Sequence, residues 1–435
     1  MKRRLFDDLV AWKAKDNRLP LILQGARQVG KSWLLQEFGK QCYENVVHIN
    51  LEANKSARDL FEGDLIPSRL ISYLETLVGQ AILPDKTLLI LDEIQSCPRA
   101  LTSLKSFAEE APQYHIAAAG SLLGVAIHRE NYSYPVGKVM EMRLYPLDFE
   151  EWLTAMGQEL LLEQIRAHYQ TNEKLPTSIH EIALDWWRKY LVVGGMPAAV
   201  NEFIQSGSFP LVTEVHNRIL NEYISDMAKY AQGSTAVKVR ACYQSIPAQL
   251  SKENKKFQYK VVQNGGSATI FGESIEWLNQ AGVVLKCRMC DQGLVPLPAY
   301  MSLSDFKLYL SDVGLLTMLS NMPQSMVLSP LMVDNTFMGA LVENYVAQEL
   351  AAHGNSLFYW KNHNTAELDF LLQRGEQIIP VEVKKGTRVQ AKSLNQYRIT
   401  YHPSLSIRLS QKNFGQEEDI KSVPLYALFA LSANR

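Results

Sequence analysis

The stretch that decides the fold is residues 21–32, which read Leu21-Ile-Leu-Gln-Gly-Ala-Arg-Gln-Val-Gly-Lys-Ser32. The run from Leu21 to Gln24 predicts a short apolar strand, and a helix is expected to follow from Ser32. Gly25 and Gly30 bracket the loop between them, so its backbone N–H groups can approach phosphate oxygens at the helix N-terminus. We therefore expect ATP to bind the loop and the first helical turn: Gly25, Ala26, Arg27, Gln28, Val29, Gly30, Lys31, Ser32 and Trp33.

Four residues are expected to carry chemistry at this loop. Lys31 can reach the β- and γ-phosphates, and the Ser32 hydroxyl can ligate Mg²⁺. A second apolar run, Thr87 to Leu91, ends in Asp92 with Glu93 next to it. In that arrangement the first carboxylate holds the Mg²⁺ shell and the second orients an attacking water. The sequence thus predicts Lys31 and Glu93 as catalytic residues, with Ser32 and Asp92 as Mg²⁺ ligands.

Two further features of this site stay open. Ser121 follows the apolar run His115 to Ala119, where it would either contact the γ-phosphate or form an ordinary turn at the strand end. An arginine from a neighbouring subunit often completes such sites, which makes an oligomer a candidate state. Arg129 and Arg143 are equal candidates for that arginine.

The order of expected elements predicts the fold class. Strands alternate with helices over the first 120 residues or so, which is typical of a parallel α/β sheet. Long helical stretches follow Tyr145, and the order helix, polar stretch, helix and apolar run between Ala236 and Pro298 resembles a winged helix. We predict a P-loop ATPase core at residues 1–148, a helical lid at 149–234, a winged-helix-like domain at 235–325 and a further α/β domain at 326–435.

Composition narrows the class of protein. Apolar residues make up 47% and charged residues 20% of 435 residues, as in a folded protein. The formal net charge of −1 excludes a basic field over the whole chain. Five cysteines without regular spacing favour a reducing compartment, and no run of about 18 apolar residues predicts a membrane span. We expect a cytoplasmic protein without a membrane partner.

A second group of chemical residues lies near the C-terminus, in Glu367-Leu-Asp369 and Pro380-Val-Glu382-Val-Lys384. Alternation along the second strand directs Glu382 and Lys384 to one face. Asp369 and Glu382 would then hold a divalent cation, and Lys384 would position or activate a water. The alternative is a solvated strand face, since surface strands often carry Glu and Lys. Basic residues dominate from Arg374 to Lys412, which makes DNA a candidate partner here.

The chain resembles bacterial and archaeal AAA+-like ATPases whose ATPase module is followed by a domain of unknown function. The resemblance rests on these segments: Gly25 to Ser32, Leu91-Asp-Glu-Ile-Gln95, Val136-Gly-Lys138, Leu144-Tyr-Pro-Leu-Asp-Phe-Glu-Glu151, Gly194-Gly-Met-Pro197 and Phe306 to Leu315. It implies that Gly195 and Pro197 lie near the nucleotide base, whereas the residues alone are equally compatible with a helix-breaking turn. Relatives often have Gly-Arg where this chain has Gly137-Lys138.

The C-terminal motif resembles the PD-(D/E)XK nuclease superfamily, which implies a restriction-endonuclease-like α/β fold. Glu343, in the expected helix Thr336 to Ala352, matches the acidic residue that many members place in their first helix. The resemblance therefore implies Glu343, Asp369 and Glu382 as Mg²⁺ ligands and Asp369, Glu382 and Lys384 as catalytic residues. Some members have this fold without activity.

Two functional hypotheses follow. In the first, ATP hydrolysis is coupled to a nuclease-like domain that handles nucleic acid. In the second, nucleotide occupancy switches a module that binds a partner protein, and the nuclease-like domain is an inactive scaffold. The second hypothesis is favoured by the expected second helix of the winged helix, because Ala268 to Gln280 contains Glu273 and Glu276 but no Lys or Arg.

Overall fold

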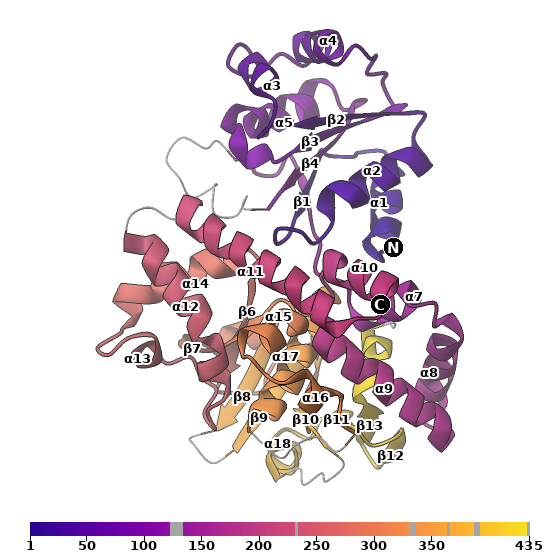
Figure 1. Cartoon of the computed structure of the whole chain (residues 1–435), viewed down its shortest axis with the longest axis vertical. Helices are drawn as coiled ribbons and strands as arrows, with labels where there is room; N and C mark the ends of the chain where they lie inside the picture. The colour runs from indigo at the N-terminus through magenta and orange to yellow at the C-terminus, as the bar shows by residue number, and fades with distance from the viewer. Residues whose placement is uncertain (122–133, 231–233, 331–335, 363–365, 387–391, 433–435) are drawn as a thin grey trace. The chain divides into compact units, whose positions relative to one another are not determined.

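The computed structural model describes residues 1–121, 134–230, 234–330, 336–362, 366–386 and 392–432 (Figure 1). The chain divides into two compact units. The first contains Met1–Tyr145 with Gln280–Gly282, and the second contains Pro146–Asn279 with Val283–Arg435. No described helix has the length and apolar character that a membrane span requires.

The first unit is built on a five-stranded sheet whose order is β2-β3-β4-β1-β5. All its neighbouring strands pair in parallel, as the alternation of strands and helices predicts. Its strands are β1 (Leu21–Gln24), β2 (Asn45–Asn50), β3 (Thr87–Asp92), β4 (His115–Gly120) and β5 (Met140–Arg143). Its helices are α1 (Leu5–Lys13), α2 (Lys31–Cys42), α3 (Lys55–Leu60), α4 (Pro67–Val78), η1 (Ile94–Ser96) and α5 (Pro98–Glu110).

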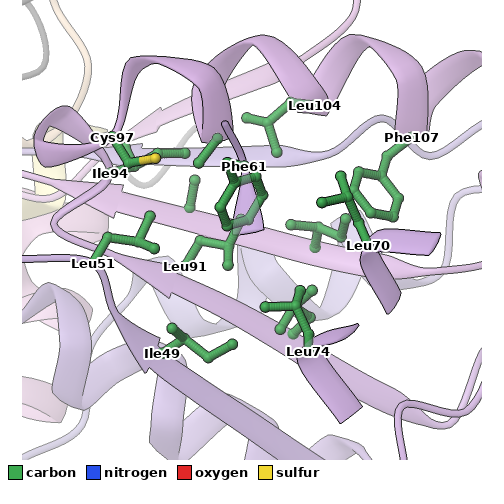
Figure 2. Packing of buried hydrophobic residues seen from close by; sticks show 14 of the residues in the cluster. Ile49, Leu51, Phe61, Leu70, Leu74, Leu91, Ile94, Cys97, Leu104 and Phe107 are labelled. Carbon is green, nitrogen blue, oxygen red and sulfur yellow. The ribbon is translucent and has the colours of Figure 1, made fainter. Parts of the chain in front are cut away.

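Helices cover both faces of this sheet. Figure 2 shows the core on one face, where Leu74 of α4 and Phe107 of α5 belong to the same buried cluster as Leu91 of β3. On the other face α2 lies so close to the strands that a Cβ on Gly39 would be 2.6 Å from Val46 and 3.3 Å from Leu88. Burial of both faces explains why the central strands are continuously apolar.

The second unit combines many helices with one mixed sheet. Its helices are α7 (Phe149–Ala155), α8 (Glu159–Thr171), α9 (Thr177–Val193), α10 (Pro197–Ser206), α11 (Phe209–Tyr230), α12 (Ser234–Leu250), α13 (Tyr259–Val262), α14 (Ala268–Gln280), α15 (Val313–Leu319), α16 (Gln324–Leu328), α17 (Thr336–Ala352) and α18 (Lys392–Tyr401), with η2 (Leu297–Tyr300) and η3 (Leu425–Ser432). From α7 to α11, over the segment predicted to be a lid, the described residues form helices without a strand, and the lid itself stays a prediction.

The sheet of the second unit has eight strands in the order β12-β13-β11-β10-β9-β8-β6-β7. They are β6 (Val284–Cys290), β7 (Met301–Leu310), β8 (Phe358–Asn362), β9 (Ala366–Arg374), β10 (Gln377–Val383), β11 (Ser406–Ser410), β12 (Gly415–Glu417) and β13 (Ile420–Pro424). Strands β8, β9 and β10 form an antiparallel meander, and β11 pairs in parallel with β10 after the helix α18. The chain order is therefore α17-β8-β9-β10-α18-β11.

The predicted winged-helix segment shares this sheet. The hairpin of β6 and β7 follows α14, and β6 pairs in parallel with β8. One sheet thus crosses the predicted boundary between residues 325 and 326. The winged helix and the four-part division stay predictions.

Helix α17 is buried on almost every side, although it carries several polar residues. Each of these has a specific partner, which is how polar groups are tolerated inside a protein. Asn344 accepts a hydrogen bond from the Leu310 N–H at 2.8 Å and donates to the Leu310 carbonyl at 3.1 Å. Gln348 donates to the hydroxyl of Tyr190 at 2.7 Å. These bonds fix α17 between β7 and the helices of the same unit.

All five cysteines are free thiols. Cys287 and Cys290 both lie buried on β6, where a register shift between Arg288 and Cys290 interrupts the strict alternation. Burial raises the pKa of each thiol. Cys290 Sγ donates to the Leu297 carbonyl at 3.6 Å. Cys287 and Cys290 are therefore explained as buried core residues of β6.

Candidate nucleotide-binding and carboxylate sites

The loop between β1 and α2 has a backbone that requires its glycines. Gly25 has φ of 151° and Gly30 has φ of 95°, both in the region that side chains rarely adopt. A Cβ on Gly25 would lie 2.2 Å from the Leu144 carbonyl oxygen. Gln28 also has a positive φ, of 66°. The loop is therefore shaped by local backbone geometry, and it leads directly into the N-terminus of α2.

Lys31 is the first residue of α2 and is 7% exposed. Its ammonium donates to the carbonyl oxygens of Gly25 at 3.0 Å and Ala26 at 2.8 Å, so it lies within the loop. Burial lowers the pKa of Lys31 to about 8, against the opposing effect of Glu93 and Asp92. Lys31 is therefore still cationic near neutral pH, which is the state that can bind phosphate.

Asp92 ends β3 and is buried. It accepts hydrogen bonds from Ser32 and from the Glu93 N–H, the latter at 3.0 Å. His48 Nε2 on the neighbouring strand β2 lies 3.0 Å from Asp92 Oδ2. Burial alone would raise the pKa of Asp92, but the hydrogen bonds from His48 and Ser32 outweigh it and hold the pKa below its ordinary value. Asp92 is thus an anion held beside the loop.

Glu93 leaves the strand with φ of 51°, a strained value for a residue with a side chain. Its Oε2 accepts a hydrogen bond from Gln95 Nε2 at 2.5 Å. Strained backbone tends to persist only where the surrounding structure imposes it, and it is frequent at functional sites. The chain then enters the short helix η1 at Ile94.

The sheet order places further predicted residues at the same edge. Strand β4 lies between β1, which ends at Gln24, and β3, which ends at Asp92. The buried Ser121 is the first residue after β4. On the other side of β1, Arg143 is opposite Gln24 and is exposed. Ligands of parallel α/β sheets bind at this carboxyl edge. Arg129, the other candidate arginine, lies outside the described residues.

The donor set fits Mg²⁺. Ser32 and Asp92 already share a hydrogen bond, so a hydroxyl and a carboxylate oxygen converge at one point. Mg²⁺ prefers hard oxygen ligands and usually keeps only one or two from protein, with the rest from water and phosphate. Ser32 and Asp92 are the residues that would hold it.

The C-terminal motif belongs to a larger group that we call the carboxylate cluster: Glu343 of α17, Glu367 and Asp369 of β9, and Glu382 of β10. Four lysines surround the cluster: Lys255, Lys307, Lys361 and Lys384.

The three residues of the C-terminal motif, Asp369, Glu382 and Lys384, lie together in this cluster. Lys384 Nζ is 2.5 Å from Glu382 Oε1, so the two residues do lie on one side. Asp369 Oδ2 accepts a hydrogen bond from the Val383 N–H at 2.7 Å, which brings β9 and β10 together. Burial raises the pKa of Asp369, and Glu343 and Glu382 add to the rise. The pKa of Glu382 is also raised by burial, although Lys384 opposes the rise.

Glu343 has a different environment. It is 2% exposed and accepts bonds from Lys255, from Lys307 at 2.9 Å and from the Tyr309 hydroxyl at 2.5 Å. Burial alone would raise the pKa of Glu343, but Lys255 and Lys307 lower it overall. Protein donors thus engage both oxygens of Glu343, and its predicted role as a metal ligand stays a prediction. Asp369 and Glu382 remain the part of the motif that fits a cation.

A third group brings carboxylates and a histidine together. Among the described residues, only Asp148, Glu150 and His353 place three His, Cys, Asp or Glu ligand atoms within 4.8 Å of one another. Asp148 caps α7 in a capping box with Glu151, and Glu150 pairs with Arg166. These contacts give the group a structural role at the start of α7.

Comparisons with known families agree with the first of these sites. A family model described as an AAA domain matches residues 17–153, which include the loop, Asp92 and Ser121. Residues 17–153 are therefore similar to an AAA domain. Two models of domains of unknown function, DUF8612 and DUF4143, match residues 184–326 and 338–428.

Solved structures similar to this chain include three nucleotide-related proteins. The Walker-type ATPase of Pyrococcus abyssi is 14% identical, with 73% of this chain and 95% of that chain covered and a TM-score of 0.46. The Aeropyrum pernix ORC2 protein is 14% identical, with 75% and 93% covered and a TM-score of 0.38. AMPPCP-bound DnaA from Aquifex aeolicus is 12% identical, with 64% and 89% covered and a TM-score of 0.31. Similarity this distant says nothing more about this chain. No curated protein matches it in sequence.

Two other predicted residues, Trp33 and Lys138, also lie in the first unit. Trp33, on the first turn of α2, is 46% exposed. Lys138, where relatives often have arginine, pairs with Glu109 at 2.9 Å. Sequence reasoning missed two residues that support the site: Arg3, which donates to the Val29 carbonyl of the loop at 3.0 Å, and His48, which lies beside Asp92. Neither residue belongs to a local motif. The only sequence signal for His48 is that it lies on the predicted strand β2, which pairs with β3.

The Gly194-Gly-Met-Pro197 segment belongs to the second unit, and Pro197 begins α10 there. Gly195 donates its N–H to Asp312 Oδ2 at 2.6 Å. Cβ atoms on Gly194 and Gly195 would lie 2.3 Å from Asp312 Oδ1 and 2.0 Å from the Leu147 carbonyl oxygen. The helix-breaking turn is thus explained by close packing. The predicted place of Gly195 and Pro197 near the nucleotide base stays a prediction.

Proposed function

We propose that the protein is an Mg²⁺-dependent ATPase whose nucleotide state controls its C-terminal region. The convergence of Lys31, Ser32 and Asp92 at one edge of a parallel sheet is the observation that carries the proposal. The AAA-domain match over residues 17–153 supports it.

Each residue of the site has a role in this proposal. The amides from Gly25 to Gly30 and the ammonium of Lys31 bind the phosphates, where positive charge opposes the charge that develops during phosphoryl transfer. Bound Mg²⁺ would supply further neutralisation of phosphate charge. Glu93 orients and accepts a proton from the attacking water, while Gln95 holds its other oxygen. Ser121 contacts the γ-phosphate or the water.

We propose that the region controlled by ATP is a nuclease-like domain that handles DNA. The chain order α17-β8-β9-β10-α18-β11 supports this proposal, as does the meeting of Asp369, Glu382 and Lys384. The excess of basic residues from Arg374 to Lys412 would attract phosphate. Arg388, one of them, lies outside the described residues.

A second candidate function is a nucleotide-switched module that binds a protein partner, with the nuclease-like domain as an inactive scaffold. The specific observation that favours it is the neutralisation of Glu343 by Lys255 and Lys307. The exposed Glu273 on α14 agrees with a protein partner rather than DNA at the winged-helix segment.

ATP turnover with Mg²⁺ tests the first proposal. Turnover by wild type is expected to fall at least about 100-fold in Lys31→Ala and in Glu93→Gln, because these remove a phosphate-binding charge and the water-orienting carboxylate. Lys40→Ala is the matched control, since Lys40 is an exposed lysine of the same helix α2. Unchanged turnover in Lys31→Ala would refute the ATPase proposal.

Cleavage of plasmid and single-stranded DNA with Mn²⁺ or Mg²⁺, with and without ATP, separates the two candidates. A nuclease predicts cleavage that Asp369→Ala abolishes, together with DNA affinity that falls steeply with salt because phosphate contacts release counterions. ATP turnover without cleavage, and binding of DNA that is absent or insensitive to salt, would favour the protein-binding module.

A further inference from the structure

The carboxylate cluster contains a lysine that arrives from a distant part of the chain. Lys255 belongs to the segment between α12 and α13, yet its ammonium bonds to Glu343 of α17. It also opposes, together with Lys307, the rise in the pKa of Asp369 that burial causes. Lys255 therefore supplies positive charge to the residues that the C-terminal motif assigns to a cation.

The main chain next to Lys255 is firmly attached to β7. The Phe257 N–H donates to the Phe306 carbonyl at 2.8 Å, and the two phenyl rings stack with centroids 5.5 Å apart. Lys256 pairs with Asp305 at 2.6 Å. The position from which the Lys255 side chain reaches the cluster is thus set by contacts that do not involve Lys255 itself.

The two lysines on Glu343 differ in how easily they could leave. Lys307 projects from β7, is 1% exposed, and bonds to both Glu343 at 2.9 Å and Glu367 at 2.8 Å. Lys255 projects from a segment outside helix and strand, its side chain is 17% exposed, and its ion pair is with Glu343 alone among those of the described residues. Lys307 is therefore a fixed part of the site, whereas Lys255 can move to solvent by a change of side-chain rotamers.

An acceptor in the same cluster has no donor. Glu382 is 3% exposed, and its Oε2 has no hydrogen-bond partner among the described residues, while Oε1 pairs with Lys384. A buried carboxylate oxygen without a donor is costly, and a cation relieves that cost. Loss of the Lys255 charge would therefore remove one of the positive charges that face these carboxylates.

We propose that Lys255 is a tethered cation that competes with a divalent cation for the carboxylate cluster, so that the cluster binds metal when Lys255 withdraws. The inference rests on the nuclease-like part of the proposed function. It identifies a control element for that site: rotation of the Lys255 side chain out to solvent, from a main chain that stays attached to β7, would switch metal binding on. Glu343 becomes available as an acceptor only in the withdrawn state.

Mn²⁺ binding to the nucleotide-free full chain tests the proposal, with Asp92→Asn as the background to remove the predicted ligand at the ATP site. Adding Lys255→Met is expected to lower the Kd for Mn²⁺ by roughly ten-fold or more, because one positive charge leaves the cluster. Lys255→Gln provides a second neutral variant if Lys255→Met does not fold. Lys255→Arg keeps the charge and should leave the Kd unchanged, as should Lys252→Met, which neutralises an exposed lysine of the same segment.

The site of the added Mn²⁺ is tested by combining Lys255→Met with Glu382→Gln, which should abolish the gain in affinity. An equal Kd in folded Lys255→Met, Lys255→Gln and Lys252→Met would overturn the inference, as would a gain that survives Glu382→Gln. DNA cleavage is a separate measurement on the same variants. Tighter Mn²⁺ binding without cleavage would support the lysine competition while refuting the nuclease activity.

Discussion

The buried charge of Lys31, which is predicted to bind phosphate, should lower the stability of the nucleotide-free folded protein by a measurable amount. The pKa of Lys31 falls from the ordinary 10.5 to about 8, mainly through burial. Each pKa unit corresponds to about 1.4 kcal/mol, so the protonated lysine destabilises the folded state by about 3 kcal/mol at pH 7. Lys31→Met keeps the volume and removes the charge.

The pH dependence distinguishes this cost from any change in packing. Below pH 8 the lysine is protonated in both states, and the full penalty applies to wild type. Between pH 8 and 10.5 the folded state loses its proton first, so wild-type stability rises with pH relative to Lys31→Met. We expect Lys31→Met to be the more stable protein at pH 7, by up to about 3 kcal/mol, and the advantage to vanish near pH 10.5.

Urea denaturation of the nucleotide-free full chain at pH 7, 8.5 and 10 measures this difference. ATP turnover of Lys31→Met should be lost at the same time. Lys40→Met is the control for a lysine on the exposed face of α2, and its stability relative to wild type should not change with pH. A difference between Lys31→Met and wild type that stays constant from pH 7 to 10 would refute the reasoning.

Three further predictions concern other positions. Gly25→Ala should unfold the loop and abolish ATP binding in a nucleotide titration, because its Cβ would lie 2.2 Å from the Leu144 carbonyl oxygen; normal affinity would contradict this. Burial raises the pKa of Asp312 to about 6, so wild-type stability should fall by about 3 kcal/mol from pH 4 to 6 relative to Asp312→Asn in denaturant titrations, and parallel curves would be the contrary result. Arg3 bonds to the Val29 carbonyl at 3.0 Å, so Arg3→Met should lose about 2 kcal/mol of stability and weaken ATP binding, whereas an unchanged melting temperature and Kd would show that the bond is dispensable.

Local patterns predicted the nucleotide loop and the helices and strands next to it. Gly25 and Gly30 allow the positive φ values of the loop, and the helix that follows is stabilised by its own hydrogen bonds. The conformation of this segment is therefore encoded mostly by its own contiguous residues. The predicted helix from Thr336 to Ala352 is confirmed as α17 for the same reason. Strand β7 was missed because its sequence mixes polar and apolar residues. One of these polar residues, Lys307, is only 1% exposed.

The sequence by itself determined the phosphate loop, the pairing of that loop with Asp92 and Glu93, and the neighbouring positions of Glu382 and Lys384. Only the tertiary structure decided which charges meet over long separations, since burial and partners depend on how distant segments pack. Lys255 and Glu343 lie 88 residues apart in the chain, and no local periodicity connects them. Their contact turns a predicted metal ligand into a carboxylate already neutralised by lysines, because a buried charge is stabilised by whichever opposite charge the fold brings to it.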